Sequence, residues 1–134
     1  MKQIETDICI IGGGSGGLSL AAGAVQMGAR VVLFEGGQMG GDCLNSGCVP
    51  SKALLAAAKA AYLANGNAAM GITNTPPNID FAAVKAHVAD VIAQIEPHDS
   101  IARFEALGVT VIPEMAHFTG PRAVASATHH VRAK

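Results

Sequence analysis

A run of glycines set between two apolar segments constrains the fold of this chain more than any other feature. Residues 5–11 end in a continuous apolar stretch, which is typical of a strand buried on both faces. Three glycines in the spacing Gly-x-Gly-x-x-Gly follow directly: Gly12, Gly14 and Gly17. An alanine-rich helix is expected over 18–27, and the apolar residues 31–34 predict a second strand. This order predicts a βαβ unit with a right-handed connection.

The glycine spacing at the start of that helix suits the binding of a dinucleotide. A tight turn, a backbone without Cβ atoms beside a pyrophosphate and close helix–strand packing all favour glycine. The first turn of the helix offers unpaired N–H groups to phosphates. Glu35, at the end of the second strand, is placed to accept hydrogen bonds from a ribose, and its charge disfavours a 2′-phosphate. The alternative is a glycine-rich turn without a ligand, and the glycines do not distinguish FAD from NAD.

The remainder of the chain is expected to alternate helices with short β segments. The segment 36–50 is rich in glycine and is expected to be irregular. Pro50 can occupy the first position of a helix, and Asp80 can cap the next one. The further elements expected are helices at 50–64 and 81–95, a break or kink at Pro97, a helical continuation capped by Asp99 or Ser100 that ends at Leu107, a loop at 65–78, and strands at 109–112, 116–118, 123–126 and 130–134. A mixed sheet that stopped at the last of these would leave an unpaired edge.

Composition and charge exclude several classes of protein. Half of the 134 residues are hydrophobic and 14% are charged, which excludes a disordered chain and a highly charged nucleic-acid-binding arm. The formal net charge of −1 gives no broad attraction to phosphates or membranes. No apolar stretch is long enough for a membrane-spanning helix, and Glu5 and Asp7 argue against a signal peptide. We therefore expect a cytoplasmic protein with no nucleic-acid partner and no membrane partner.

Two of the three cysteines, Cys43 and Cys48, lie five residues apart in the segment GGDCLNSGCVPSK, and three interpretations of this pair compete. A structural disulfide across so short a loop would contribute only ~2 kcal/mol to stability. A metal site would need two further ligands, and the histidines show no suitable spacing. The third interpretation is a redox-active disulfide.

Redox chemistry explains the cysteine pair best. In a regular helix, residues five apart have Cα atoms ~8.6 Å apart, beyond the ~7 Å that a disulfide can bridge. The pair is therefore expected where a helix is distorted or begins. A helix start and the positive charge of Lys52 would both lower the pKa of a thiol. An exposed and strained disulfide in such surroundings is easily reduced.

These motifs together resemble the N-terminal part of the pyridine nucleotide–disulfide oxidoreductases, which include dihydrolipoamide dehydrogenase, mercuric reductase and glutathione reductase. The resemblance is carried by ICIIGGGSGG, by the strand that ends in Glu35 and above all by GGDCLNSGCVPSK. It extends over essentially the whole chain and is closest to the dihydrolipoamide dehydrogenase and mercuric reductase branch. It implies an α/β fold: a Rossmann-like, doubly wound FAD-binding domain with a β-meander, incomplete at its C-terminus.

The resemblance also implies roles for individual residues. In such enzymes NAD(P)H reduces FAD, FAD reduces the disulfide, and the dithiol reduces the substrate. Cys48 would be the thiol that faces the flavin and Cys43 the thiol that meets the substrate, with Lys52 beside the flavin ring. Main chain near Ala116 and His117 would contact the adenine. The other residues expected to bind the cofactor are Gly12, Gly14, Gly17, Glu35, Gly41 and Asp42, and no metal is expected.

Two residues depart from the family pattern. Asp42 stands where threonine is common and brings a carboxylate near the expected pyrophosphate, so it must turn away or accept hydrogen bonds. Glu114 stands where glycine is common, at the segment expected to contact the adenine.

The length is a third departure. Residues 1–134 would be a partial FAD-binding domain, without the nicotinamide-binding and dimerisation domains that make the full-length family members homodimers. We expect these 134 residues alone to be inactive, and the full-length enzyme to reduce a small-molecule or protein disulfide. The alternative is a non-catalytic truncated remnant that binds FAD or nothing.

Overall fold

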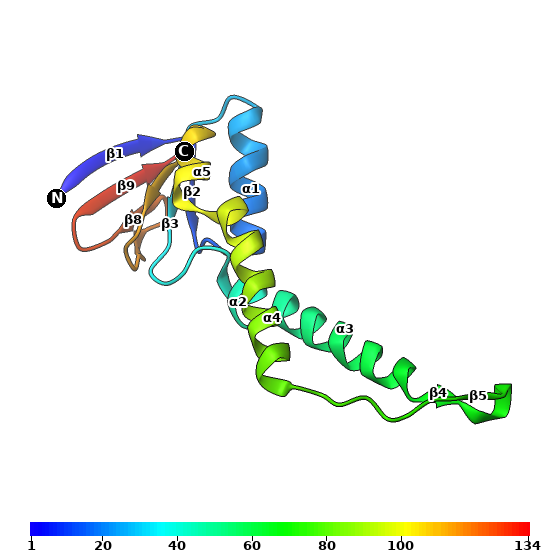
Figure 1. Ribbon diagram of the computed structural model, residues 1–134. Coiled ribbons are helices and arrows are strands. Elements are labelled where there is room, and N and C mark those ends of the chain that lie inside the picture. Colours follow the sequence, from blue (N-terminus) through cyan, green and yellow to red (C-terminus); the bar gives the residue numbers. More distant parts are fainter.

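The computed structural model describes residues 1–134 and contains two larger β-sheets and five α-helices (Figure 1). The helices are α1 (Ser15–Gln26), α2 (Gly41–Asn45), α3 (Cys48–Ala64), α4 (Phe81–Ile95) and α5 (Ile101–Ala106), with the 3-10 helices η1 (Ala68–Met70) and η2 (Glu96–Asp99). The strands are β1 (Lys2–Thr6), β2 (Ile8–Ile11), β3 (Val31–Phe34), β4 (Gly66–Asn67), β5 (Ile72–Thr73), β6 (Thr110–Ile112), β7 (His117–Gly120), β8 (Ala123–Ala125) and β9 (His129–Ala133). We call residues 48–95 the arm and the remainder the body.

The first sheet is parallel and has the order β2-β3-β6. Its central strand β3 is buried at all four residues, as its apolar sequence predicts. Side chains of β3 alternate between two cores, because successive residues of a strand point to opposite faces. Val31 and Leu33 pack in the core that includes α1 and α5, whereas Val32 and Phe34 pack in the core shared with the second sheet. The first sheet therefore lies between a helical layer and a β layer.

The second sheet has the order β1-β9-β8-β7, in which β7, β8 and β9 form an antiparallel meander and β1 pairs with β9 in parallel. The predicted Rossmann-like α/β fold with a β-meander is confirmed. The predicted unpaired edge at the last strand is wrong, because β9 is held between β1 and β8 and its Val131 is fully buried. The strand that covers it is β1, of which only Glu5 and Thr6 fall within the strand predicted over 5–11.

The single strand predicted over 5–11 is divided at Asp7, where the chain steps from one sheet to the other. The buried Thr6 donates its hydroxyl to the carbonyl oxygen of Arg30 at 2.7 Å. The Asp7 carboxylate accepts the Arg30 N–H at 2.9 Å and pairs with the Lys134 ammonium at 2.6 Å. Hydrogen bonds from Lys134 and then from Arg30 hold the pKa of Asp7 well below its usual range. These polar contacts stabilise the step.

Two segments expected to be irregular contain secondary structure. The segment 36–50 contains α2 and the first turn of α3, which begins at Cys48 rather than at Pro50. Proline is tolerated as the third residue of a helix because N–H groups of the first turn have no intrahelical partner. The expected loop at 65–78 contains a small hairpin of β4 and β5 around η1. The predicted cap at Asp80 is present, since its carboxylate accepts the Ala83 N–H at 3.1 Å.

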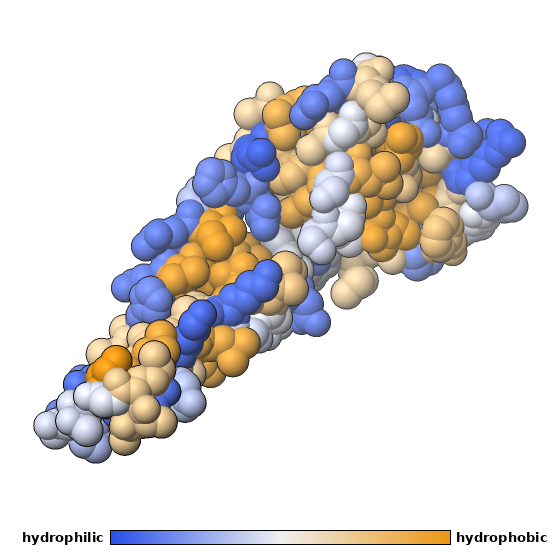
Figure 2. Space-filling view, turned by 90° about the vertical axis from the view of Figure 1, so that its right-hand side faces the viewer, coloured by the Kyte–Doolittle hydropathy of each residue, from blue (hydrophilic) through white to orange (hydrophobic).

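The arm extends away from the two sheets as an α3–α4 helix pair with the β4–β5 hairpin at its far end (Figure 1). Ala53 is the only buried residue of the arm. Figure 2 shows hydrophobic surface along the arm as well as on the body. The large apolar side chains that the arm exposes are Leu54, Leu55, Tyr62, Leu63, Met70, Ile72, Ile79 and Phe81. The arm is therefore a helix pair with almost no core of its own.

Candidate functional site

The glycine loop 12–17 joins the carboxyl end of β2 to the start of α1. A Cβ atom at Gly17 would overlap the carbonyl oxygen of Gly12, so the loop can close this tightly only with glycine there. α1 begins after Gly14 without a side-chain cap, and its first turn carries no acidic residue. Its first N–H groups and their partial positive charge are therefore available to an anionic group.

A second glycine segment lies against this loop. The Gly40 N–H donates to the carbonyl oxygen of Gly13 at 2.8 Å, and Gly14 and Gly40 form an isolated parallel β-bridge. Gly41 then begins α2, the helix that carries Cys43. The contact brings the glycines at the start of α1 beside the segment that contains the cysteine pair.

Glu35 lies at the carboxyl end of β3, on the edge of the parallel sheet where open α/β folds bind ligands. Its side-chain oxygens accept two main-chain N–H groups, from Gly13 at 2.5 Å and from Gly37 at 2.6 Å. The carboxylate thus connects the glycine loop with the turn that follows β3.

Asp42 is engaged on its own helix. Its Oδ1 accepts a hydrogen bond from the Ser46 hydroxyl at 2.7 Å, one helical turn further on. The nearby Asn45 closes the same segment, because its side-chain amide donates to the carbonyl oxygens of Gly41 at 2.8 Å and Met39 at 3.1 Å. Asn45 was not among the predicted site residues, since an asparagine near a glycine pair is too common a pattern to single out.

Cys43 lies on α2 and Cys48 is the first residue of α3, so the helix breaks between them. At the break the Gly47 N–H donates to the carbonyl oxygen of Asp42 at 2.5 Å, and a Cβ atom at Gly47 would come within 2.8 Å of that oxygen. In a continuous helix, two cysteines at this sequence spacing would be too far apart to form a disulfide. The break between α2 and α3 removes that constraint. Both cysteines carry free thiols; Cys48 is exposed and Cys43 is half-buried.

The expectation of a lowered thiol pKa is wrong for Cys43. A hydrogen bond with Cys48, and next burial, raise the pKa of the Cys43 thiol above its ordinary value. The charge of Lys52 lowers this pKa, but it is the smallest of the contributions. A helix start and a lysine favour the thiolate, but here the neighbouring thiol of Cys48 outweighs Lys52 and favours the protonated form of Cys43. Lys52 itself is exposed and lies one turn after Cys48.

The segment expected to contact the adenine connects β6 to β7 and passes beside the turn after β3. A Cβ atom at Gly36 would come within 2.9 Å of the Met115 Cα. The half-buried Ala116 follows Met115 and packs against the core between the two sheets, while His117 is exposed. The structure thus places the main chain at Ala116 near Glu35, on the same edge of the parallel sheet.

Glu114 makes a contact that the sequence did not predict. Its Oε2 accepts the Thr128 N–H at 3.1 Å, and its Oε1 accepts the Thr128 hydroxyl and lies 3.7 Å from His129 Nδ1. Hydrogen bonds from Ser126 and then from Thr128 lower the pKa of Glu114 to about 2. The carboxylate therefore joins the β6–β7 segment to the turn between β8 and β9.

The site as a whole fits a dinucleotide cofactor such as FAD. The glycines allow close approach to the main chain, α1 offers unpaired N–H groups, and Glu35 supplies an acceptor at the end of β3. Asp42, the residue that could have repelled a pyrophosphate, is hydrogen-bonded to Ser46. No cluster of three or more His, Cys, Asp or Glu side chains could hold a metal ion.

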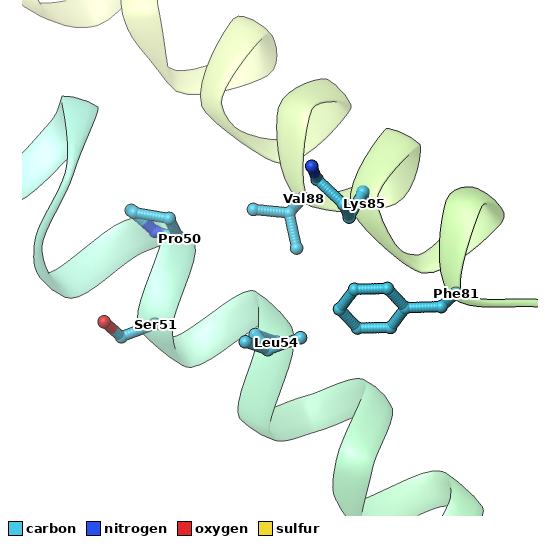
Figure 3. A pocket seen from close by; sticks show the side chains of 6 residues that line it. All are labelled: Pro50, Ser51, Leu54, Phe81, Lys85 and Val88. Atoms are coloured by element: carbon cyan, nitrogen blue, oxygen red, sulfur yellow. The ribbon is translucent and has the colours of Figure 1, made fainter.

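A groove of about 440 Å³ lies elsewhere, between α3 and α4. Figure 3 shows its lining side chains projecting from the two facing helices: Pro50, Ser51, Leu54, Phe81, Lys85 and Val88. With 3.6 residues per turn, Pro50 and Leu54 lie on the opposite side of α3 from Cys48 and Lys52. This apolar groove is therefore separate from the cysteine pair.

Comparison with known proteins identifies the family. The family model described as pyridine nucleotide-disulphide oxidoreductase matches residues 6–134. The chain belongs to this family. The resemblance inferred from the glycine and cysteine motifs is confirmed, and members of the pyridine nucleotide–disulfide oxidoreductase family use FAD and NAD(P)H.

Two curated relatives show how this family member compares with longer proteins. The chain is 41% identical to dihydrolipoyl dehydrogenase from Geobacillus stearothermophilus over 92 aligned residues. This alignment covers 69% of the chain and 20% of the relative. The chain is 31% identical to mercuric reductase from Bacillus cereus over 130 aligned residues. This alignment covers 97% of the chain and 21% of the relative. The chain thus spans about a fifth of the length of these relatives.

A solved structure supports the family fold. The HOCl-induced flavoprotein disulfide reductase RclA from Escherichia coli, in its Cu(II) complex, matches with a TM-score of 0.74 and 22% identity, covering 94% of this chain and 26% of that chain. At this level of identity the match supports the fold of the chain alone.

No helix of the chain has the length and apolar character needed to span a membrane.

Proposed function

We propose that residues 1–134 are the FAD-binding portion of a dihydrolipoamide dehydrogenase-like flavoprotein. In this proposal electrons pass from NAD(P)H through FAD to Cys43 and Cys48, and then to a disulfide-type acceptor. The observation that carries the proposal is the contact between Gly14 and Gly40, which joins the glycine loop to the segment that holds both cysteines. A glycine-rich turn without a ligand gives no reason for that juxtaposition.

Bound FAD would supply the two-electron chemistry that links a pyridine nucleotide to a dithiol. The chain's own residues bind and orient it. The N–H groups at the start of α1 would bind the pyrophosphate, with Gly12, Gly14, Gly17 and Gly41 allowing close approach and Asp42 held aside by Ser46. Glu35 would accept hydrogen bonds from the ribose hydroxyls while retaining its main-chain partners, because each carboxylate oxygen has more than one acceptor site.

The cysteine pair would act by thiol–disulfide exchange. The Cys43 thiolate attacks one sulfur of the acceptor disulfide, a mixed disulfide forms, and the other acceptor sulfur leaves and takes up a proton. The Cys48 thiolate then attacks the Cys43 sulfur, which releases the second acceptor thiol and forms the Cys43–Cys48 disulfide. The acceptor gains the two electrons and two protons that the pair loses.

The raised pKa of Cys43 sets a requirement for this exchange. Near neutral pH the thiol holds its proton, so a base must remove it before attack. In a full-length homodimer we assign that task to a His–Glu pair of the partner subunit. The proposed setting is the cytoplasm, and the acceptor is a small-molecule or protein disulfide. Lys52 and the main chain at Ala116 complete the cofactor site, beside the flavin ring and the adenine respectively.

Titration of the 134-residue chain with FAD tests cofactor binding. Quenching of flavin fluorescence should report a complex, and NADH or NADPH should not be oxidised steadily. Glu35→Ala should weaken FAD binding by ~1–3 kcal/mol, the scale of hydrogen bonds to a charged group. Glu105→Ala, at an exposed residue of α5, is the control and should leave the affinity unchanged. Equal affinity of the wild type and Glu35→Ala would show that the ribose is assigned to the wrong carboxylate.

Oxidation of the reduced chain by lipoamide tests the cysteine pair. Mass spectrometry should find one disulfide, and peptide mapping should place it between Cys43 and Cys48. Cys43→Ser and Cys48→Ser should each prevent its formation and leave FAD bound, whereas Cys9→Ser should not prevent it, because Cys9 lies half-buried in β2 against the core between the sheets. Full oxidation of the Cys48→Ser chain to an intramolecular disulfide would contradict the proposed pair.

A further inference from the structure

Two carboxylates follow the carboxyl ends of the neighbouring strands β3 and β6. Glu35 comes directly after β3, and Glu114 comes two residues after β6. Their main chains share an acceptor: the carbonyl oxygen of Ile112 accepts the Glu35 N–H at 3.0 Å and the Glu114 N–H at 2.8 Å. The two residues are therefore parts of one edge, on which Glu35 contacts the glycine loop.

The Glu114 carboxylate is fixed from a different side, by the turn between β8 and β9. It accepts both the N–H and the hydroxyl of Thr128. The same hydroxyl lies 2.7 Å from His129 Nδ1, and the His129 N–H donates to the Ser126 hydroxyl oxygen at 3.2 Å. Ser126 is 6% exposed and directly follows β8. A glutamate held by this many groups cannot move freely, although it lies at the protein surface.

Because Glu114 is held in place, the residues that follow it, up to Ala116 in the segment expected to contact the adenine, are restrained as well. The next residue, Met115, lies against Gly36, since a Cβ atom at Gly36 would come within 2.9 Å of the Met115 Cα. Ala116 follows and packs on the core between the sheets. The main chain from Glu114 to Ala116 is thus held on one side by Thr128 and on the other by the turn after Glu35.

We propose that Glu114 is a positioning residue for the adenosine end of FAD, through its hydrogen bonds to the β8–β9 turn, which hold the main chain at Ala116 in place beside Glu35. The inference rests on the proposed FAD site. It assigns a role to a side chain at a position where the family pattern has only a glycine. Glu114 acts through Ala116 and need not touch the cofactor itself.

Binding of three probes to the 134-residue chain tests this role: FAD, ADP and FMN. ADP carries the adenosine without the flavin, and FMN carries the flavin without the adenosine. Glu114→Gln should weaken binding of ADP and FAD about tenfold, the scale of one or two lost hydrogen bonds to a charged group, and should leave FMN binding unchanged. Thr128→Val, which removes the hydroxyl that donates to Glu114, should weaken ADP and FAD binding in the same way. Thr128→Ser, which keeps the hydroxyl, should bind ADP and FAD as the wild type does. Glu105→Gln is the matched control and should bind all three probes as the wild type does.

Each outcome decides a separate question. Unchanged ADP affinity in a folded Glu114→Gln chain overturns the positioning role, and so does an equal loss for ADP and FMN, which a general loss of structure would give. If Glu114→Gln does not fold, the contrast between Thr128→Val and Thr128→Ser decides instead. A wild-type chain that binds neither ADP nor FAD overturns the proposed function itself.

Discussion

The body and the arm are stabilised in different ways. The body has two hydrophobic cores, one on each face of the parallel sheet, and the central strand β3 contributes to both. The arm is almost as long in sequence as a small domain, yet Ala53 is its only buried residue. The body is therefore stabilised by non-local packing, and the arm by helix propensity and by contacts between α3 and α4.

This difference separates the two halves of the proposed site. The glycine loop, Glu35 and Glu114 belong to the body, where neighbouring strands fix them. Cys48 and Lys52 belong to the first turns of α3, at the point where the arm leaves the body (Figure 1). Damage to the far part of the arm should thus leave cofactor binding intact, whereas damage to the body should affect the whole chain.

The largest contrast is expected from removing one aromatic ring in each region. Phe104 is 2% exposed in the body and Phe81 is 60% exposed on the arm. Phe104→Ala should lower the free energy of unfolding by ~3–5 kcal/mol, the cost of a large cavity. Phe81→Ala should lower it by less than about 1 kcal/mol. Urea denaturation followed by circular dichroism measures both; similar losses would show that the arm is part of the main core.

A proline in the middle of α3 tests whether the arm can unfold separately. Ala58→Pro removes an intrahelical hydrogen bond and clashes with the preceding turn, at a local cost of ~3 kcal/mol. The far-UV helix signal should fall, while the thermal midpoint of the body and its affinity for ADP stay near those of the control, Ala58→Ser. Loss of ADP binding together with the helix signal would mean that body and arm fold as one unit.

Two neighbouring glycines of the body offer a sharper comparison. A Cβ atom at Gly17 would overlap the carbonyl oxygen of Gly12, whereas a Cβ atom at Gly16 meets nothing within 4 Å. Gly17→Ala should therefore destabilise the chain by ~1–3 kcal/mol, and Gly16→Ala should be neutral or slightly stabilising because alanine favours the helix. Thermal unfolding of the two variants measures the difference. A stable Gly17→Ala chain would contradict the tight closure of the loop.

The smallest effect is expected on acid stability. The pKa of Glu114 is about 2 in the folded chain, below its ordinary value of 4.5. The contact with Ser126, Thr128 and His129 therefore stabilises the body above pH 4.5, and this contribution is lost as the pH falls toward 2. The unfolding midpoint of Glu114→Gln should approach that of the wild type over this range. Parallel curves from pH 5 to pH 2 would place the acid sensitivity elsewhere in the body, for example at Asp7.

Local patterns in the sequence predicted the strands of the parallel sheet, α1, α3 and α4, whereas the meander was implied by the family resemblance. The local patterns failed at Asp7, because a continuous β-forming stretch does not reveal that its two halves pair with β9 and β3, respectively. They also failed at the Cys43 thiol, where the pKa depends on how closely Cys48 approaches. The contacts of Glu114 with Thr128 and His129 could not be predicted, since these residues meet only after the sheets have formed.

The pairing of β1 with β9 has a consequence for the synthesis of the chain. Within residues 1–134, β1 is the first element along the chain and its partner β9 is the last. On the ribosome β1 must therefore remain without its parallel neighbour while the α3–α4 pair, which needs only local contacts, can already form. Lys2, Gln3 and Glu5 are exposed along β1, and such polar side chains protect a waiting strand from pairing with other chains. β1 is therefore the strand of the body that waits longest for its partner.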